Sequence, residues 1–449
     1  MFGVRPVVVS VGAITFILLA CTLCPDSIDN WLLTRPASPE TSSGQPRQWG
    51  PHKDEECSVE GAASDEYKLH VEDEVLADLK ERLVRWRAPG APMEHDDGWS
   101  YGINSNFMAK LVDEWRDDYD WGKYEAQLNT VGLSETVVDG LIIRMHHIQR
   151  GSGKKAILLL HGWPGSIWEF NKFIPLMQNQ TTLDEYGIVC PSLPGYGFSG
   201  APNIEGYNTV AMAGTMKRLM EKLGYESYVV QGGDWGSMVA QSMAYLDPSP
   251  LIGLHLNFFP CTFSPGHFLR EEFQIRFWDD EGSRERARKS RDIAAILSQI
   301  GYLHQQATKP ETTGHALSDS PAGMCAWISE KFQSWSDPSL PLGDKFNTQD
   351  ILTNCMIYWA TNSITSSMRL YKEQFHSDEA MAVYNLRVTL PVALSLFPHE
   401  IFPPADAQIR TRFRNIVLFQ KHETGGHFAA LENPDLLLGD LVEFIKRVQ

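Results

Sequence analysis

The sequence predicts an α/β fold with a mostly parallel sheet, on the basis of two patterns. Short apolar runs alternate with helical stretches, and one long helical block interrupts the alternation. Apolar runs without polar alternation are typical of parallel strands, because helices cover both faces of such a sheet. The expected strands are residues 156–160, 187–190, 227–230, 251–256, 391–396 and 415–419.

The expected helices lie before, between and within these strands. Residues 71–86 place apolar side chains at helical spacing, and residues 106–115 form a second helix-like stretch. The part of the chain before the sheet is therefore expected to hold helices and loops. A further helix is expected over residues 209–223. Between residues 256 and 391 helices, aromatic residues and loops replace the strand pattern, which predicts a lid inserted into the sheet.

The amino terminus carries an uncharged, mostly apolar run at residues 7–24, close to the length of a membrane-crossing helix. A membrane anchor is the preferred interpretation, and a cleaved signal peptide or a buried core helix are the alternatives. Arg5 before the run and Asp26 after it favour a cytosolic amino terminus with the body across the membrane. Residues 37–60, rich in Pro, Ser, Gly and charge, are typical of a linker.

These patterns divide the chain into five parts. They are a membrane anchor (1–30), a linker with the amino-terminal segment (31–150), the first part of the core (151–259), a helical lid (260–386) and the second part of the core (387–449).

Composition excludes several classes of protein. Of the 449 residues 43% are hydrophobic, enough for a large core, and the formal charge is −17. An acidic chain is repelled by a phosphate backbone, so no nucleic-acid partner is expected. The seven cysteines show neither zinc-site spacing nor a disulfide framework, so reduced thiols and no metal or cofactor are expected.

The sharpest local signal is residues 229–237, where an apolar strand runs into a turn rich in glycine. Gly232 and Gly236 flank Asp234 in the pattern small-x-nucleophile-x-small, which exposes the central side chain above a sheet. The glycines are needed because a Cβ there would collide with the adjacent strand or helix. Asp234 is the candidate nucleophile, and capping of the following helix is its alternative role.

The segment HGWPG, residues 161–165, directly follows an expected strand. A turn there can aim the backbone N–H of Trp163 at the same point as the N–H of Trp235, and two such donors form an oxyanion hole. A purely structural turn is the alternative. Residues 191–199, after the next strand, are expected to shape a turn without taking part in the chemistry.

His427 follows a glycine pair after the last expected strand, at the edge of the sheet where such folds place their sites. It is the candidate base, with His422 as the next residue to test. Glu400, after the penultimate strand, is its candidate acid partner. The nearest rival acid is Asp406, in a proline-rich segment expected to be an exposed loop. The chain order nucleophile, acid, histidine matches that of α/β-hydrolases.

A carboxylate nucleophile suits attack at saturated carbon. Its product is an ester of Asp234, which water hydrolyses when a base activates the water and an oxyanion hole stabilises the tetrahedral intermediate. A serine would form an ether that water could not remove. Epoxides and alkyl halides are substrates of this kind, and an epoxide also needs a proton donor for its oxygen.

Several motifs together resemble the microsomal-type epoxide hydrolases, which include the mammalian xenobiotic enzyme and the insect juvenile hormone epoxide hydrolases. The resemblance extends from about residue 67 to the end of the chain, and the apolar amino terminus agrees with the membrane anchor of that family. The motifs are HGWPGS, PSLPGYGFSG, QGGDWGS, GYLHQQATKP with DSPAG, RLYKE and GGHFAALENP.

The resemblance implies an α/β-hydrolase fold with Asp234 as nucleophile, His427 as base and Glu400 as its acid partner. It also implies two lid tyrosines, Tyr302 and Tyr371, that donate hydrogen bonds to the epoxide oxygen. The implied reaction adds water to a small apolar epoxide. Xenobiotic arene or alkene epoxides, as in detoxification of aromatic hydrocarbons, a terpenoid hormone and lipid epoxides are all compatible substrates.

The family implies an enzyme of the endoplasmic reticulum membrane whose catalytic body faces the cytosol. This orientation is opposite to the one that the flanking charges favour, and we adopt it because a single arginine sets orientation weakly.

Two other functions fit parts of the pattern. A haloalkane dehalogenase shares an Asp nucleophile followed by Trp, but it has no need of the tyrosine pair, and a chloride-release assay separates the two activities. A non-catalytic α/β-hydrolase-like binding protein is expected to lack the nucleophile or the histidine, and both are present here.

Overall fold

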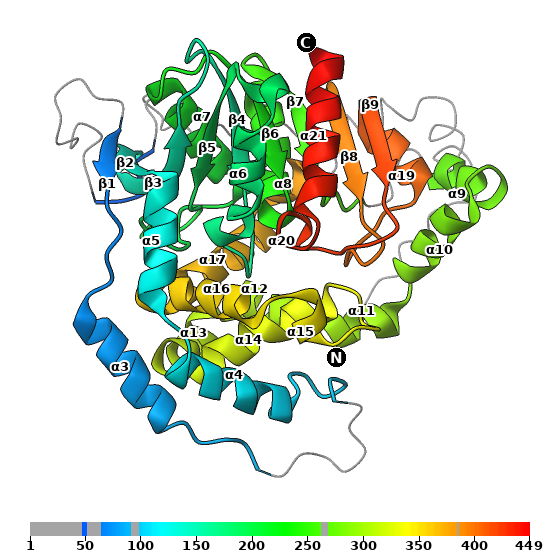
Figure 1. Ribbon diagram of the computed structural model, residues 1–449. Coiled ribbons are helices and arrows are strands. Elements are labelled where there is room, and N and C mark those ends of the chain that lie inside the picture. Colours follow the sequence, from blue (N-terminus) through cyan, green and yellow to red (C-terminus); the bar gives the residue numbers. More distant parts are fainter. Residues whose placement is uncertain (1–46, 52–63, 91–97, 262–267, 384–385) are drawn as a thin grey trace, which may run out of the picture.

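The computed structural model describes residues 47–51, 64–90, 98–261, 268–383 and 386–449. Its centre is a nine-stranded sheet with the strand order β1-β2-β3-β5-β4-β6-β7-β8-β9 (Figure 1). The strands are β1 (Asp65–Tyr67), β2 (Leu133–Val138), β3 (Leu141–Ile148), β4 (Lys155–Leu160), β5 (Tyr186–Pro191), β6 (Ser227–Gly232), β7 (Leu251–Leu256), β8 (Val388–Leu396) and β9 (Phe413–Lys421).

Strands β4 to β9 are parallel to one another, as the apolar runs predicted. The expectation of only helices and loops before the sheet is wrong, because β1, β2 and β3 extend the sheet as antiparallel strands. In β2 and β3 buried and partly exposed residues are interspersed, so they lack the continuous apolar run of a central strand.

Helices cover both faces of the sheet. Figure 1 shows α6 and α21 in front of it, and these two helices pack against each other, while α7 and α8 pack together behind it. The helices outside the long block are α3 (Asp73–Val84), α4 (Ser105–Asp117), α5 (Trp121–Val131), α6 (Phe173–Gln178), α7 (Thr209–Lys222), α8 (Asp234–Leu246), α19 (Asp406–Arg412), α20 (Ala429–Glu432) and α21 (Pro434–Val448), with the short 3-10 helices η1 (Ile167–Phe170) and η2 (Thr181–Leu183).

The chain between β7 and β8 is helical and lies across one end of the sheet (Figure 1). Helices α3, α4 and α5 of the amino-terminal segment pack against α14 and α16 of this block and so brace it from outside. The block consists of α9 (Phe268–Phe277), α10 (Glu281–Lys289), α11 (Ile293–Gln299), α12 (Gly301–Thr308), α13 (Pro310–Asp319), α14 (Pro321–Ser334), α15 (Leu342–Lys345), α16 (Thr348–Ala360), α17 (Ile364–Phe375) and α18 (Asp378–Val383).

The expected membrane anchor, residues 1–30, and most of the expected linker lie outside the described residues. Among the helices of the described ranges, none combines the length and the apolar character that crossing a bilayer requires.

Candidate active site

Asp234 stands at the turn between β6 and α8, as the first residue of that helix. Its backbone φ is 43°, in the left-handed region that residues other than glycine rarely adopt. The first turn of α8 packs directly on β4, because a Cβ on Gly236 would be 2.5 Å from the carbonyl carbon of Leu160. Glycine is therefore required there, and the strained turn places the Asp234 side chain at the carboxyl end of the sheet.

The turn after β4 supplies a hydrogen bond to this side chain. The backbone N–H of Trp163 donates to Oδ1 of Asp234 over 2.7 Å, so the carboxylate bonds outside α8 and does not cap that helix. Gly162 lies so close that a Cβ there would be 2.6 Å from Cγ of Asp234. The N–H of Trp235 belongs to the first turn of α8, where a helix offers no acceptor to its N–H groups.

His427 and Glu400 meet because the ends of β8 and β9 run side by side. A parallel bridge pairs His399 with Gly426, which brings the next residues of both segments together. Nδ1 of His427 lies 2.7 Å from Oε1 of Glu400. Its Nε2 lies 3.3 Å from Oδ2 of Asp234, although not in line for a hydrogen bond. The three predicted side chains therefore form one connected group.

The charges of this group act on the histidine. Burial disfavours the charged imidazole, but the Glu400 and Asp234 carboxylates outweigh burial and raise the pKa of His427 well above its usual value. In the free enzyme the ring is therefore held as an imidazolium between two carboxylates. Loss of the Asp234 charge removes part of this stabilisation and lowers the pKa of His427.

The two rival residues lie elsewhere. Asp406 is not on an exposed loop: it begins α19 and pairs with Arg286 and Lys421. Nε2 of His422 lies 2.7 Å from Oδ2 of Asp440, so its ring is engaged away from Asp234.

A cavity of about 350 Å³ opens above Asp234. Apolar side chains such as Met238, Phe258 and Leu303 supply most of its walls. Its polar groups include Asp234 and two tyrosines of the helical block, Tyr302 of α12 and Tyr371 of α17. The cavity thus combines apolar walls with the candidate nucleophile and two hydroxyl groups that can donate.

Aromatic contacts hold the two tyrosines in place. The Tyr302 ring stacks on Trp163 at a centroid distance of 5.2 Å, and the Tyr371 ring meets Trp235 edge-on at 4.7 Å. Burial, together with Tyr302 and Asp234 nearby, raises the pKa of Tyr371 well above its usual value. This phenol therefore keeps its proton and can donate a hydrogen bond.

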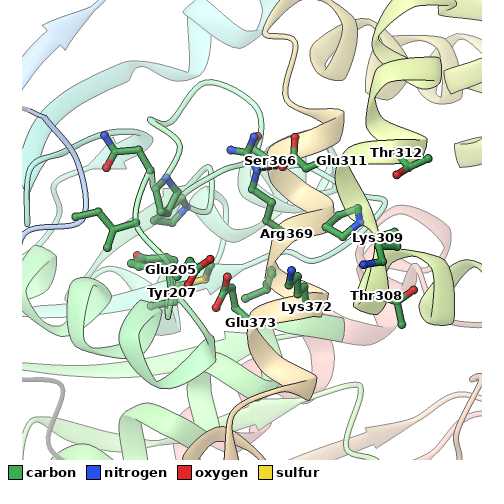
Figure 2. Close-up of a pocket in the computed structure, with 17 residues that line it drawn as sticks. Glu205, Tyr207, Thr308, Lys309, Glu311, Thr312, Ser366, Arg369, Lys372 and Glu373 are labelled. Atoms are coloured by element: carbon green, nitrogen blue, oxygen red, sulfur yellow. Dashed lines mark hydrogen bonds and ion pairs between the residues drawn. The ribbon is translucent and has the colours of Figure 1, made fainter.

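A larger cavity, of about 520 Å³, lies on the opposite side of α17 and contains none of the predicted site residues. Figure 2 shows Arg369, Lys372 and Glu373 extending into it from that helix. Nε of Arg369 donates to Oε1 of Glu311 over 2.6 Å, so part of this charge is already paired. This cavity is the larger of the two, but Asp234 and the two tyrosines line the smaller one.

Two residues near His427 were absent from the sequence predictions. The carbonyl of Trp335 accepts the backbone N–H of His427 over 2.9 Å, and the two rings lie 5.0 Å apart. Trp335 follows α14, more than 90 residues before the histidine, and nothing local marks it. Glu169 in η1 is the second, and its only sequence signal is an acid within the buried stretch after HGWPG.

The described ranges contain no cluster of three or more His, Cys, Asp or Glu side chains that could bind a metal ion.

The fold and site define an α/β-hydrolase, and comparisons with known proteins agree. The family model described as "alpha/beta hydrolase fold" matches residues 155–308. The model described as "Epoxide hydrolase N terminus" matches residues 64–170.

The chain belongs to the epoxide hydrolase family, as the motifs predicted. It is 36% identical to epoxide hydrolase 1 of Oryctolagus cuniculus over 435 residues, covering 89% of this chain and 92% of the relative. It is also 36% identical to juvenile hormone epoxide hydrolase 1 of Ctenocephalides felis, covering 89% and 88%. The crystal structure of juvenile hormone epoxide hydrolase from the silkworm Bombyx mori matches with a TM-score of 0.81, at 32% identity over 90% of this chain and 98% of that chain.

Proposed function

We propose that this epoxide hydrolase converts apolar epoxides to vicinal diols through a covalent ester of Asp234. In the first step one carboxylate oxygen attacks an epoxide carbon while the other accepts the Trp163 N–H. The C–O bond of the ring breaks, and the released oxygen takes a proton from one of Tyr302 and Tyr371 and a hydrogen bond from the other. Both hydroxyls belong to the cavity that Asp234 lines, which places donors where negative charge develops.

In the second step water cleaves the ester. Once Asp234 is esterified its negative charge is gone, so the pKa of His427 falls and the ring becomes a competent base. His427 takes a proton from water, and the hydroxide attacks Cγ of Asp234. Glu400 orients the ring through Nδ1 and stabilises its charged form. The N–H groups of Trp163 and Trp235 stabilise the oxyanion of the tetrahedral intermediate.

The single observation that supports this mechanism is that His427 lies between two carboxylates. Its ring is 2.7 Å from Glu400 and 3.3 Å from Asp234. Since Asp234 attacks without a base, His427→Gln should still form the ester but not hydrolyse it. Intact-protein mass spectrometry after exposure to styrene oxide should show a gain of one substrate mass. Glu400→Gln should accumulate less ester, because the histidine remains. Free turnover of the His427 variant would contradict the mechanism.

The substrate class follows from the cavity. Its walls are mostly apolar and its volume is about 350 Å³, so an uncharged epoxide of xenobiotic, lipid or terpenoid type fits it better than a charged one. The helical block supplies both tyrosines and covers the site, so it acts as a lid that excludes water during ester formation. Turnover of styrene oxide, a juvenile hormone and an epoxy fatty acid under one set of conditions ranks these classes.

The proposal extends to location: residues 1–30 anchor the enzyme to the endoplasmic reticulum membrane with the catalytic body in the cytosol. The supporting observations are the charge-free run at 7–24 and the resemblance to the microsomal type. Deletion of residues 1–30 should release active enzyme from membranes. Retention of the shortened protein after a high-salt wash would contradict a single anchor.

A further inference from the structure

Glu169 is an acid beside the catalytic group that the mechanism above does not use. It belongs to η1, which begins immediately after the turn that carries Trp163. Its carboxylate lies against the backbone of that turn, since a Cβ on Gly165 would be only 2.5 Å from Cδ of Glu169. Two carboxylates therefore contact the same turn: that of Asp234 lies against Gly162, and that of Glu169 lies against Gly165.

The short helix η1 also packs against α20, the helix that follows His427 directly. Ile167, Trp168 and Phe170 of η1 are buried, whereas Glu169 is only half-buried. Within the part of the chain that the structure describes, no hydrogen bond or ion pair engages its carboxylate. The carboxylate of Glu169 thus has no hydrogen-bond donor among the described residues and is open to a small molecule. It lies between the turn at residues 161–165, called the oxyanion turn below, and the segment that contains His427.

We propose that Glu169 positions the water that hydrolyses the Asp234 ester; this inference rests on the proposed ester mechanism. The water oxygen forms a bond to Cγ of Asp234, one proton passes to Nε2 of His427, and a carboxyl oxygen of Glu169 accepts a hydrogen bond from the remaining O–H. The bond from Cγ to the alkyl oxygen then breaks, the diol oxygen takes the proton from His427, and the acid left at Asp234 gives up its proton, which balances the proton that the tyrosine supplied in the first step. Glu169 has the same protonation state before and after.

The charges on His427 and Asp234 couple Glu169 to the progress of the reaction. Burial raises the pKa of Glu169 to about 8, with His427 lowering it and Asp234 raising it. As His427 takes a proton from water, its positive charge lowers the pKa of Glu169, and the neutral ester no longer supplies the opposing charge of Asp234, so the carboxylate becomes more populated. A carboxylate accepts a stronger hydrogen bond than a carboxylic acid does. The acceptor therefore strengthens in the step that needs water.

The other titratable groups around Glu169 do not replace it. Burial raises the pKa of Cys190 and of Tyr358 well above their usual values, so both stay neutral. The hydroxyl of Tyr358 donates to the carbonyl of Gly165 over 2.8 Å and is thus engaged. Glu432 of α20 accepts the backbone N–H of Phe428 over 3.0 Å.

The test separates the two chemical steps in Glu169→Gln, which has nearly the same shape and keeps the packing. With styrene oxide as the probe, kcat should fall about ten- to a hundredfold because the ester hydrolyses slowly. The value of kcat/KM reports ester formation, so it should stay within about threefold of wild type, and KM should fall with kcat. Mass spectrometry of the quenched enzyme should show the accumulated ester.

Glu432→Gln is the matched control, because it removes a second acid near His427 that is already hydrogen-bonded. Its kcat should stay within about threefold of wild type. The proposal is wrong if Glu169→Gln hydrolyses the ester at the wild-type rate, if it loses kcat and kcat/KM equally, or if the control loses as much. Absence of any ester in His427→Gln would instead refute the ester mechanism itself.

Discussion

Replacing Gly162 by alanine tests how tightly the oxyanion turn positions the Asp234 side chain. The added Cβ would lie 2.6 Å from Cγ of Asp234. An ordinary carbon–carbon contact is about 3.5–4.0 Å, so the carboxylate or the turn must move by about 1 Å. Either movement disturbs the 2.7 Å hydrogen bond from the Trp163 N–H. A displacement of about 1 Å at a reacting group costs about a hundredfold in rate, and overpacking costs about 1–3 kcal/mol of stability.

The assay is a single-turnover reaction with styrene oxide in which mass spectrometry follows ester formation, and urea unfolding measures stability. The ester-forming rate of Gly162→Ala should be about a hundredfold lower than that of the wild type. Gly439→Ala is the control, because a Cβ there has no neighbour within 4 Å and the residue is exposed on α21. It should keep the wild-type rate and gain up to about 1 kcal/mol of stability. Ester formation at the wild-type rate in Gly162→Ala would refute this placement of Asp234.

Three further results are expected. Replacing Tyr302 or Tyr371 singly by Phe should slow ester formation by roughly one to two orders of magnitude, and the double variant should be nearly inactive in the same single-turnover assay; a wild-type rate would reveal another donor. Asp234→Asn should form no diol when freshly purified, because an amide is a poor nucleophile, and product analysis by chromatography measures this directly. Stability should fall on acidification because burial lowers the pKa of three histidines from 6.5 to about 4, so the unfolded chain binds more protons between these values. The three histidines alone contribute up to about 4 kcal/mol per pH unit, but the raised pKa values of Glu169 and Glu432, about 8 and about 7, oppose this by about 1.4 kcal/mol each between pH 6 and 5. Urea titrations should therefore show a net loss of about 1 kcal/mol per pH unit in this range, and a gain in stability would contradict it. These histidines are His146, His161 and His255.

The parallel strands were predictable because each is a short apolar run bounded by turns. The structure lengthens most of them by one to three residues at an end, as in β6 over Ser227–Gly232, but the six expected strands are all present. Strands β2 and β3 were not predictable by the same rule, since they mix buried positions with more exposed ones, among them Arg144. Their place in the sheet depends on the pairing of β3 with β5, a long-range contact that local periodicity does not encode.

The sequence by itself determined the part of the site that short segments define. The turn around Asp234 requires glycines at fixed positions, and HGWPG places a donor next to it, so both are visible in a few consecutive residues. The positions after the last two strands added His427 and Glu400 as candidates, with His422 and Asp406 as rivals, and the family motifs added the two tyrosines and thereby epoxide hydrolysis.

The sequence left two acids and two histidines as candidates, and only the tertiary structure decided which acid and which histidine form a connected group with Asp234. Glu400 and His427 meet through the bridge between His399 and Gly426, whereas Asp406 and His422 have partners of their own. The same holds for Glu169, whose carboxylate is set against the oxyanion turn by the packing of η1 on α20. These choices depend on contacts between segments far apart in the chain, and such contacts are fixed only when the sheet and its covering helices pack together.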